Sequence, residues 1–83
     1  FPRYGLAMEL RTQQRLSEAA EAFAGIERDF PDYVPAYLLA GTTLRELGRL
    51  DDARAVLTRG IAAAEKKGDR HALGELSDAL AAL

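Results

Sequence analysis

The sequence predicts an all-α domain made of tandem antiparallel helix-turn-helix units, with about five helices in total. Three observations support this prediction. Alanine and leucine dominate the 83 residues and only 7% are aromatic, a composition that favours helix over strand. Apolar side chains recur at the period of a helix. The chain also resembles itself after a shift of 34 residues. Its length has room for a single domain, residues 1–83.

Two helices are expected in the first part of the chain. The first spans Pro2–Thr12, because a proline suits the first helical turn, and Leu6 and Leu10 lie one turn apart on one face. The second spans about 18–29, with Ser17 as its N-cap. Its apolar residues follow one another at steps of four, three and four, namely Ala19, Phe23, Ile26 and Phe30. Together the two helices form the first expected hairpin.

Three further helices are expected in the rest of the chain. The third begins at Pro35 and ends before Gly48, a residue that suits a left-handed C-cap. The fourth follows Asp51 as its N-cap and runs to Lys67. The fifth begins at Asp69. Its leucines are spaced three, four and three, so they share one face, and they are Leu73, Leu76, Leu80 and Leu83.

The internal repeat indicates how these helices pair. Under the shift of 34 residues, the matched pairs include Leu10 with Leu44, Arg15 with Arg49, Leu16 with Leu50 and Ala19 with Ala53. Small residues recur where antiparallel helices would cross, namely Ala7, Ala19, Gly41 and Ala53. A larger side chain would wedge such helices apart, at a cost of about 1–3 kcal/mol. We therefore expect two similar hairpins that nest side by side.

These residues resemble the tetratricopeptide repeat family, whose pattern places small and aromatic residues at fixed positions of two helices. The second copy has Tyr37-x-x-Ala40-Gly41-x-x-Leu44, followed by Gly48-Arg49-Leu50-Asp51-Asp52-Ala53. The first has Leu6-Ala7-x-x-Leu10, followed by Leu16-Ser17-Glu18-Ala19, and closes on Pro31. The resemblance implies an α-solenoid fragment. Repeat one would span about 1–33, repeat two about 34–68, and a capping helix about 69–83.

Two positions depart from the family pattern. Arg3 stands where the first repeat has an aromatic residue, so the packing contact there is expected to be weak or absent. Glu65 stands where the second repeat closes with proline, so the fourth helix is expected to continue to Lys67.

Composition and motifs argue against most kinds of chemistry. The chain has no cysteine, and no motif pairs its one histidine, His71, with a nucleophile. Helix capping explains Asp51 and Asp52 better than a metal site does. A net charge of −2 without a basic stripe gives no nucleic-acid site, and no apolar run reaches the ~18 residues of a membrane span. We expect no enzyme activity, cofactor, metal, nucleic acid or membrane partner.

The cellular context is less constrained. The sequence has no signal peptide, transmembrane segment or cysteine, and this favours a cytoplasmic location. The chain begins with Phe1 rather than methionine, so we interpret it as a processed chain or a piece of a longer protein.

The resemblance implies a concave groove, lined by the first helix of each repeat, that holds a peptide or protein partner. Carried over by register, the groove residues would be Tyr4, Met8, Arg11, Leu38, Thr42 and Arg45. Arg11 and Arg45 could hold an acidic or carboxylate-bearing partner, or could pair with surface acids such as Glu9 and Glu46. Relatives that clasp a chaperone's C-terminal carboxylate use lysine and asparagine. This chain has no asparagine and only the adjacent Lys66 and Lys67, so that clamp is excluded.

The function expected from these features is that of a scaffold or adaptor module. The alternative is homodimerisation through the leucine face of the fifth helix, which could pair with a second copy instead of covering the fourth helix.

Overall fold

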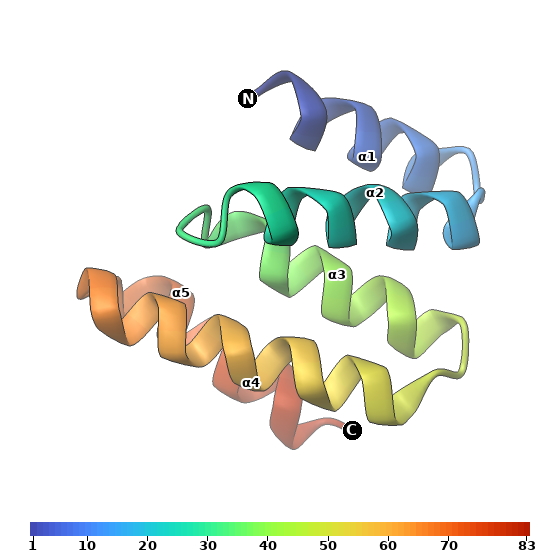
Figure 1. Cartoon of the computed structure of the whole chain (residues 1–83). Coiled ribbons are helices and arrows are strands. Elements are labelled where there is room, and N and C mark those ends of the chain that lie inside the picture. Colours follow the sequence, from blue (N-terminus) through green and yellow to red (C-terminus); the bar gives the residue numbers. More distant parts are fainter.

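The computed structural model describes all 83 residues and contains five α-helices and no strand. The helices are α1 (Pro2–Thr12), α2 (Leu16–Asp29), α3 (Pro35–Glu46), α4 (Leu50–Lys67) and α5 (Arg70–Ala81). Figure 1 shows α1 with α2, and α3 with α4, as successive antiparallel hairpins, with α5 lying behind α4. Each helix packs against its neighbours in the chain, and α5 also contacts α3. The predicted all-helical architecture of tandem hairpins is confirmed.

Three helices end in the same hydrogen-bonded turn. Gln14, Gly48 and Gly68 each adopt a left-handed backbone, with φ of 64°, 78° and 71°. The amide of the next residue then donates to a carbonyl five residues earlier at 2.9 Å, in the pairs Arg15 to Leu10, Arg49 to Leu44 and Asp69 to Ala64. This pattern satisfies carbonyls that a helix end leaves free. Gly48 therefore terminates α3 as predicted, and α4 runs to Lys67 as predicted.

The predicted N-caps of α2 and α4 are wrong. Ser17 and Asp51 lie inside the helices, because α2 and α4 begin immediately after Arg15 and Arg49. The left-handed residue before each arginine, Gln14 or Gly48, completes the reversal of the chain. The arginine therefore already occupies the N-cap position of the next helix. No side chain caps either helix. Instead, each guanidinium pairs with the acid three residues further on, at 2.6 Å and 2.8 Å.

Small residues at the helix crossings bring the backbones close together, as predicted. Ala7, Ala19 and Ala53 are fully buried. A Cβ built on Gly41 would lie 2.4 Å from the side chain of Leu57. The same atom on Gly60 would lie 2.6 Å from the Cβ of Tyr37. Both distances are far below van der Waals contact, so any larger residue at these crossings would force the neighbouring side chain or helix to shift.

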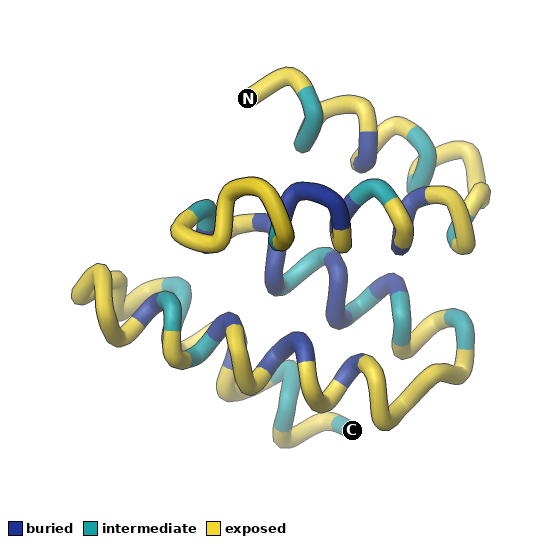
Figure 2. Tube along the Cα trace, viewed as in Figure 1, coloured by how far each residue is buried: buried dark blue, intermediate teal, exposed yellow.

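The core lies along the centres of α2, α3 and α4, where Figure 2 places most of the buried residues. Its largest fully buried apolar side chains are Phe23, Ile26, Leu57 and Leu76. Tyr37 is also buried, and its hydroxyl donates a hydrogen bond to the carbonyl of Pro31 at 2.7 Å. Leu76 belongs to α5, and Leu73, Leu80 and Leu83 pack partly buried against the same core. The C-terminal helix therefore covers the end of the second hairpin.

Leu6 and Phe30 do not enter the core, contrary to the apolar periodicity. Leu6 is 67% exposed, although its counterpart one repeat later, Ala40, is buried. The difference arises because α2 packs against α3, whereas no helix of this chain packs on the corresponding face of α1. Phe30 is 44% exposed, because the chain has left helical geometry there, with φ of −136°.

Phe30 instead completes a small surface cluster with the start of α1. The Phe1 and Phe30 rings meet edge to face at 5.0 Å between centroids, and the guanidinium of Arg3 lies 5.4 Å from the Phe30 centroid. Arg3 also pairs with Asp29 at 2.8 Å. The contact expected to be weak at Arg3 is therefore replaced by an ion pair and a cation–π contact.

Candidate functional site

A concave cavity of about 450 Å³ lies between α1, α3 and α5. Helix α3 supplies its floor, α1 one wall and α5 the other. The lining residues are Tyr4 and Met8 from α1, Val34, Pro35, Leu38 and Leu39 from the start of α3 and the residue before it, and Asp69, His71, Ala72, Glu75 and Leu76 from α5 and its N-cap. Most of the lining residues are apolar, and the ionisable acids and the histidine are confined to the α5 side.

The cavity wall formed by α1 is held by aromatic packing. The ring of Tyr4 lies 6.0 Å from that of Phe23 and 5.5 Å from that of Tyr33, both edge to face. Partial burial raises the pKa of the Tyr4 phenol, and nearby Tyr33 and Glu75 raise it further. Tyr4 of α1 and Glu75 of α5 line the same cavity, so the two helices face each other across it. Tyr4 is thus a fixed, neutral wall element, whereas Met8 is 42% exposed and has a flexible side chain.

The structure gathers three of the six predicted groove residues in this cavity, namely Tyr4, Met8 and Leu38. Arg11 lines a shallower adjoining depression of about 340 Å³, which shares Met8 and Leu39 with the cavity. Thr42 and Arg45 line neither space. The Thr42 hydroxyl donates to the carbonyl of Leu39 at 3.2 Å. Arg45 is exposed and forms no ion pair.

The charged groups near the α1 side of the cavity differ from those on its α5 side. Arg11 forms an ion pair with Glu46 that joins α1 to α3, so its charge is already balanced within the chain. On the α5 side, one oxygen of Asp69 accepts the backbone amide of Ala72 at 3.0 Å. Glu75 lies 3.3 Å from His71, which is charged only when protonated. No lysine or arginine lines the cavity, so its polar wall is acidic.

Comparison with known proteins places this architecture in a family. The family model described as tetratricopeptide repeat matches residues 10–73, most of the chain. The chain belongs to the tetratricopeptide repeat family. Its fold is similar to a tetratricopeptide repeat domain protein from Salinibacter ruber, in a crystal structure and a solution NMR structure. Both are 36% identical, both cover 96% of this chain, and the matches span 89% and 81% of those chains with TM-scores of 0.90 and 0.91. No curated protein matches.

The tetratricopeptide repeat register also accounts for the residues that the sequence prediction missed. Shifting Leu38 and Thr42 by 34 residues gives Ala72 and Leu76, which line the cavity from α5. Helix α5 therefore stands where the first helix of a further repeat would stand. The repeat spacing was a usable signal, but α5 lacks the family's aromatic and small residues at the matching positions, where it has His71 and Glu75. The prediction therefore treated it as a cap or a dimerisation surface.

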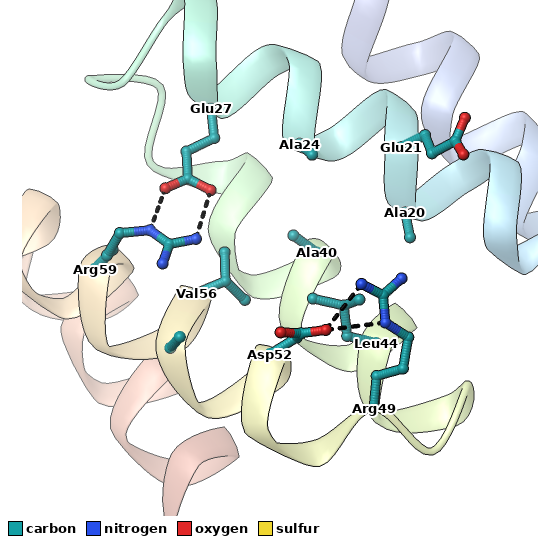
Figure 3. Close-up of a pocket in the computed structure, with 11 residues that line it drawn as sticks. Ala20, Glu21, Ala24, Glu27, Ala40, Leu44, Arg49, Asp52, Val56 and Arg59 are labelled. Atoms are coloured by element: carbon teal, nitrogen blue, oxygen red, sulfur yellow. Dashed lines mark hydrogen bonds and ion pairs between the residues drawn. The ribbon is translucent and has the colours of Figure 1, made fainter.

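A second pocket of about 260 Å³ lies on another face of the tetratricopeptide repeat, between α2 and α4 over α3. Figure 3 shows alanines along this slot and two ion pairs at its sides, Glu27 with Arg59 and Arg49 with Asp52. The first pair joins α2 to α4 and raises the pKa of Arg59. The charges within each pair neutralise each other. They are therefore less available to a binding partner than the carboxylates of the larger cavity are.

The chain has neither a cluster of metal-binding side chains nor a helix that could span a membrane. No three histidine, cysteine, aspartate or glutamate side chains come together in a way that could hold a metal ion. None of the five helices is both long enough and apolar enough to cross a membrane.

Proposed function

We propose that this chain is a protein-interaction module, a scaffold or adaptor that binds a peptide segment of a partner protein in its concave groove. The observation that supports the proposal best is the cavity formed jointly by α1, α3 and α5, with an apolar floor and a volume of about 450 Å³. That volume is typical of pockets that bury a ligand, roughly 300–1,000 Å³. Tetratricopeptide repeats are commonly protein-interaction modules, which agrees with this assignment.

The groove residues have separate roles in this proposal. Tyr4 and Leu38 give a fixed apolar surface, and Met8 adapts to the side chain that enters. Arg45, which has no partner within the chain, is available to a carboxylate further along the groove. Arg11 and Thr42 support the groove from within, through the bonds to Glu46 and Leu39.

A peptide selection tests this function. Short random peptides are displayed and selected on the immobilised chain, and the affinity of those retained is measured by titration calorimetry. We expect Met8→Ala to weaken binding by about fivefold or more, since truncation of a central contact costs over ~1 kcal/mol. Leu50→Ala is the matched control, because Leu50 is similarly exposed, at 47% against 42%, and lines neither the cavity nor the depression.

Two outcomes would refute the proposed function. Peptides that bind Met8→Ala and a Leu38→Ala variant as tightly as the natural chain would place the binding surface elsewhere and refute the proposal. Failure to retain any peptide would refute it as well. Circular dichroism of each variant shows that a loss of binding is not a loss of fold.

Homodimerisation through α5 is a second candidate. Leu73 and Leu80 remain partly exposed, which favours it, although Leu76 is 1% exposed and is used within the chain's own core. Light scattering across a dilution series tests this candidate. A mass that rises with concentration supports the dimer, and a mass that stays at that of one chain excludes it.

We also propose a cytoplasmic location, which the cysteine-free composition suits. Fractionation of cells that express the complete gene product tests this location. Recovery in the membrane or extracellular fraction would overturn it.

A further inference from the structure

The cavity offers a partner two kinds of surface side by side. Its floor and its α1 wall are mainly apolar, with Leu38 and Leu39 in the floor and Met8 in the α1 wall. Its α5 wall has the carboxylates of Asp69 and Glu75. A ligand that fills the cavity must therefore bury apolar surface and at the same time place a group next to two acids.

The two carboxylates are not neutralised by a permanent cation. Asp69 uses one oxygen to accept the Ala72 amide, and this bond leaves its negative charge in place. Glu75 lies 3.3 Å from His71, which is charged only when protonated, and it shares the cavity lining with Tyr4. The lining includes no lysine or arginine. The charged side chains that line the cavity are therefore acidic, apart from His71 when it is protonated.

The arginines of the predicted groove, Arg11 and Arg45, do not pair with these two carboxylates. Arg11 is paired with Glu46, so it offers little to an acidic ligand. Arg45 lies seven residues beyond Leu38 along α3, a separation of about 10 Å at 1.5 Å per residue. That distance equals the screening length in about 0.1 M salt. The acidic groups that line the cavity itself are Asp69 and Glu75, and neither groove arginine lines it.

We infer that the cavity selects peptide segments in which a large apolar side chain stands next to lysine or arginine. The apolar side chain occupies the space above Leu38 and Leu39, and the neighbouring cation lies against Asp69 and Glu75. This inference rests on the proposed function and adds the chemical class of the partner. An acidic peptide, which the arginine pair alone suggested, is disfavoured in the cavity itself.

The peptide selection described above tests this specificity when it is run above neutral pH. We expect the retained peptides to be enriched in apolar residues flanked by lysine or arginine. Asp69→Asn and Glu75→Gln should each weaken their binding by about 1.5- to 5-fold, the range for a solvent-exposed charge pair, and both losses should shrink at high salt. Asparagine is itself a good N-cap, so Asp69→Asn preserves the start of α5.

Asp78→Asn supplies the matched control. It removes the same charge from the same helix, but Asp78 is exposed and does not line the cavity, so affinity should be unchanged. The inference is overturned if the retained peptides are acidic or neutral around their apolar residue, or if the Asp69→Asn, Glu75→Gln double variant binds them as well as the natural chain. If Met8→Ala still weakens those peptides, the proposed function stands without this specificity. If no peptide is retained, both proposals fail.

Discussion

The close approach of Gly60 on α4 to Tyr37 on α3 allows the packing of these two helices to be tested by adding a single carbon atom. In Gly60→Ala the new Cβ would lie 2.6 Å from the Cβ of Tyr37 and 3.0 Å from Leu76 Cδ2. The Tyr37 atom is attached directly to the backbone, so no rotation of its side chain relieves the overlap, and α3 or α4 must move. An overpacked site costs about 1–3 kcal/mol. Alanine gains about 0.5–1 kcal/mol over glycine inside a helix, so the net loss is roughly 0–2.5 kcal/mol.

Gly74→Ala isolates the clash from the helix propensity. Gly74 lies inside α5, and its Cβ position has nothing within 4 Å, so this variant should gain the full ~0.5–1 kcal/mol. The two variants should then differ by the overlap alone, about 1–3 kcal/mol. At ~4–8 °C per kcal/mol for a domain of this size, Tm should differ by roughly 4–24 °C. Thermal unfolding followed by circular dichroism measures the difference, and equal upward shifts of Tm would refute the close crossing.

Three other perturbations test separate parts of the fold. Ala53→Leu should lower Tm more than Ala55→Leu, because Ala53 is fully buried at a crossing and Ala55 is exposed; equal melting temperatures would contradict the packing. Thr43→Val should raise stability by about 1 kcal/mol in urea unfolding, because the Thr43 hydroxyl is buried without a hydrogen bond, and a loss of stability would show that the hydroxyl has a partner. Hydrogen bonds from arginines, first that of Arg3, lower the pKa of Asp29 below its ordinary 3.8. The resulting stabilisation is therefore present above pH 3.8 and is lost as the pH falls through the lowered pKa of Asp29. Arg3→Gln should lose less of its free energy of unfolding over that acid range than the natural chain loses.

Apart from the N-caps of α2 and α4, sequence reasoning succeeded where the structure depends on residues close together in the chain. The left-handed turn at Gly48 needs only the end of α3 and the next residue. The small residues Ala19 and Ala53 are set by the crossing of two consecutive helices. These features lie within one hairpin, so a single sequence and its shifted copy were enough to predict them.

Sequence reasoning failed where burial depends on what lies beside a helix. Leu6 and Ala40 occupy the same repeat position, but only Ala40 has α2 packed over it. The groove shows the same limit. Tyr4, Met8 and Leu38 were predicted from register, whereas Glu75 was not, because its approach to Tyr4 depends on how α1, α3 and α5 are arranged across two hairpins. No local pattern records that arrangement.

The same dependence links the stability of the fold to the shape of the groove. Leu76 is 1% exposed in the core, it would be 3.0 Å from a Cβ at position 60, and it lines the cavity. A side chain added at Gly60 therefore pushes on a residue of the cavity wall, although Gly60 itself lies on α4 and does not line the cavity. Peptide affinity of Gly60→Ala, measured well below its Tm, should consequently fall, whereas Gly74→Ala should leave affinity unchanged. A Gly60→Ala chain that is less stable but binds normally would show that α5 holds its position independently of the α3–α4 crossing.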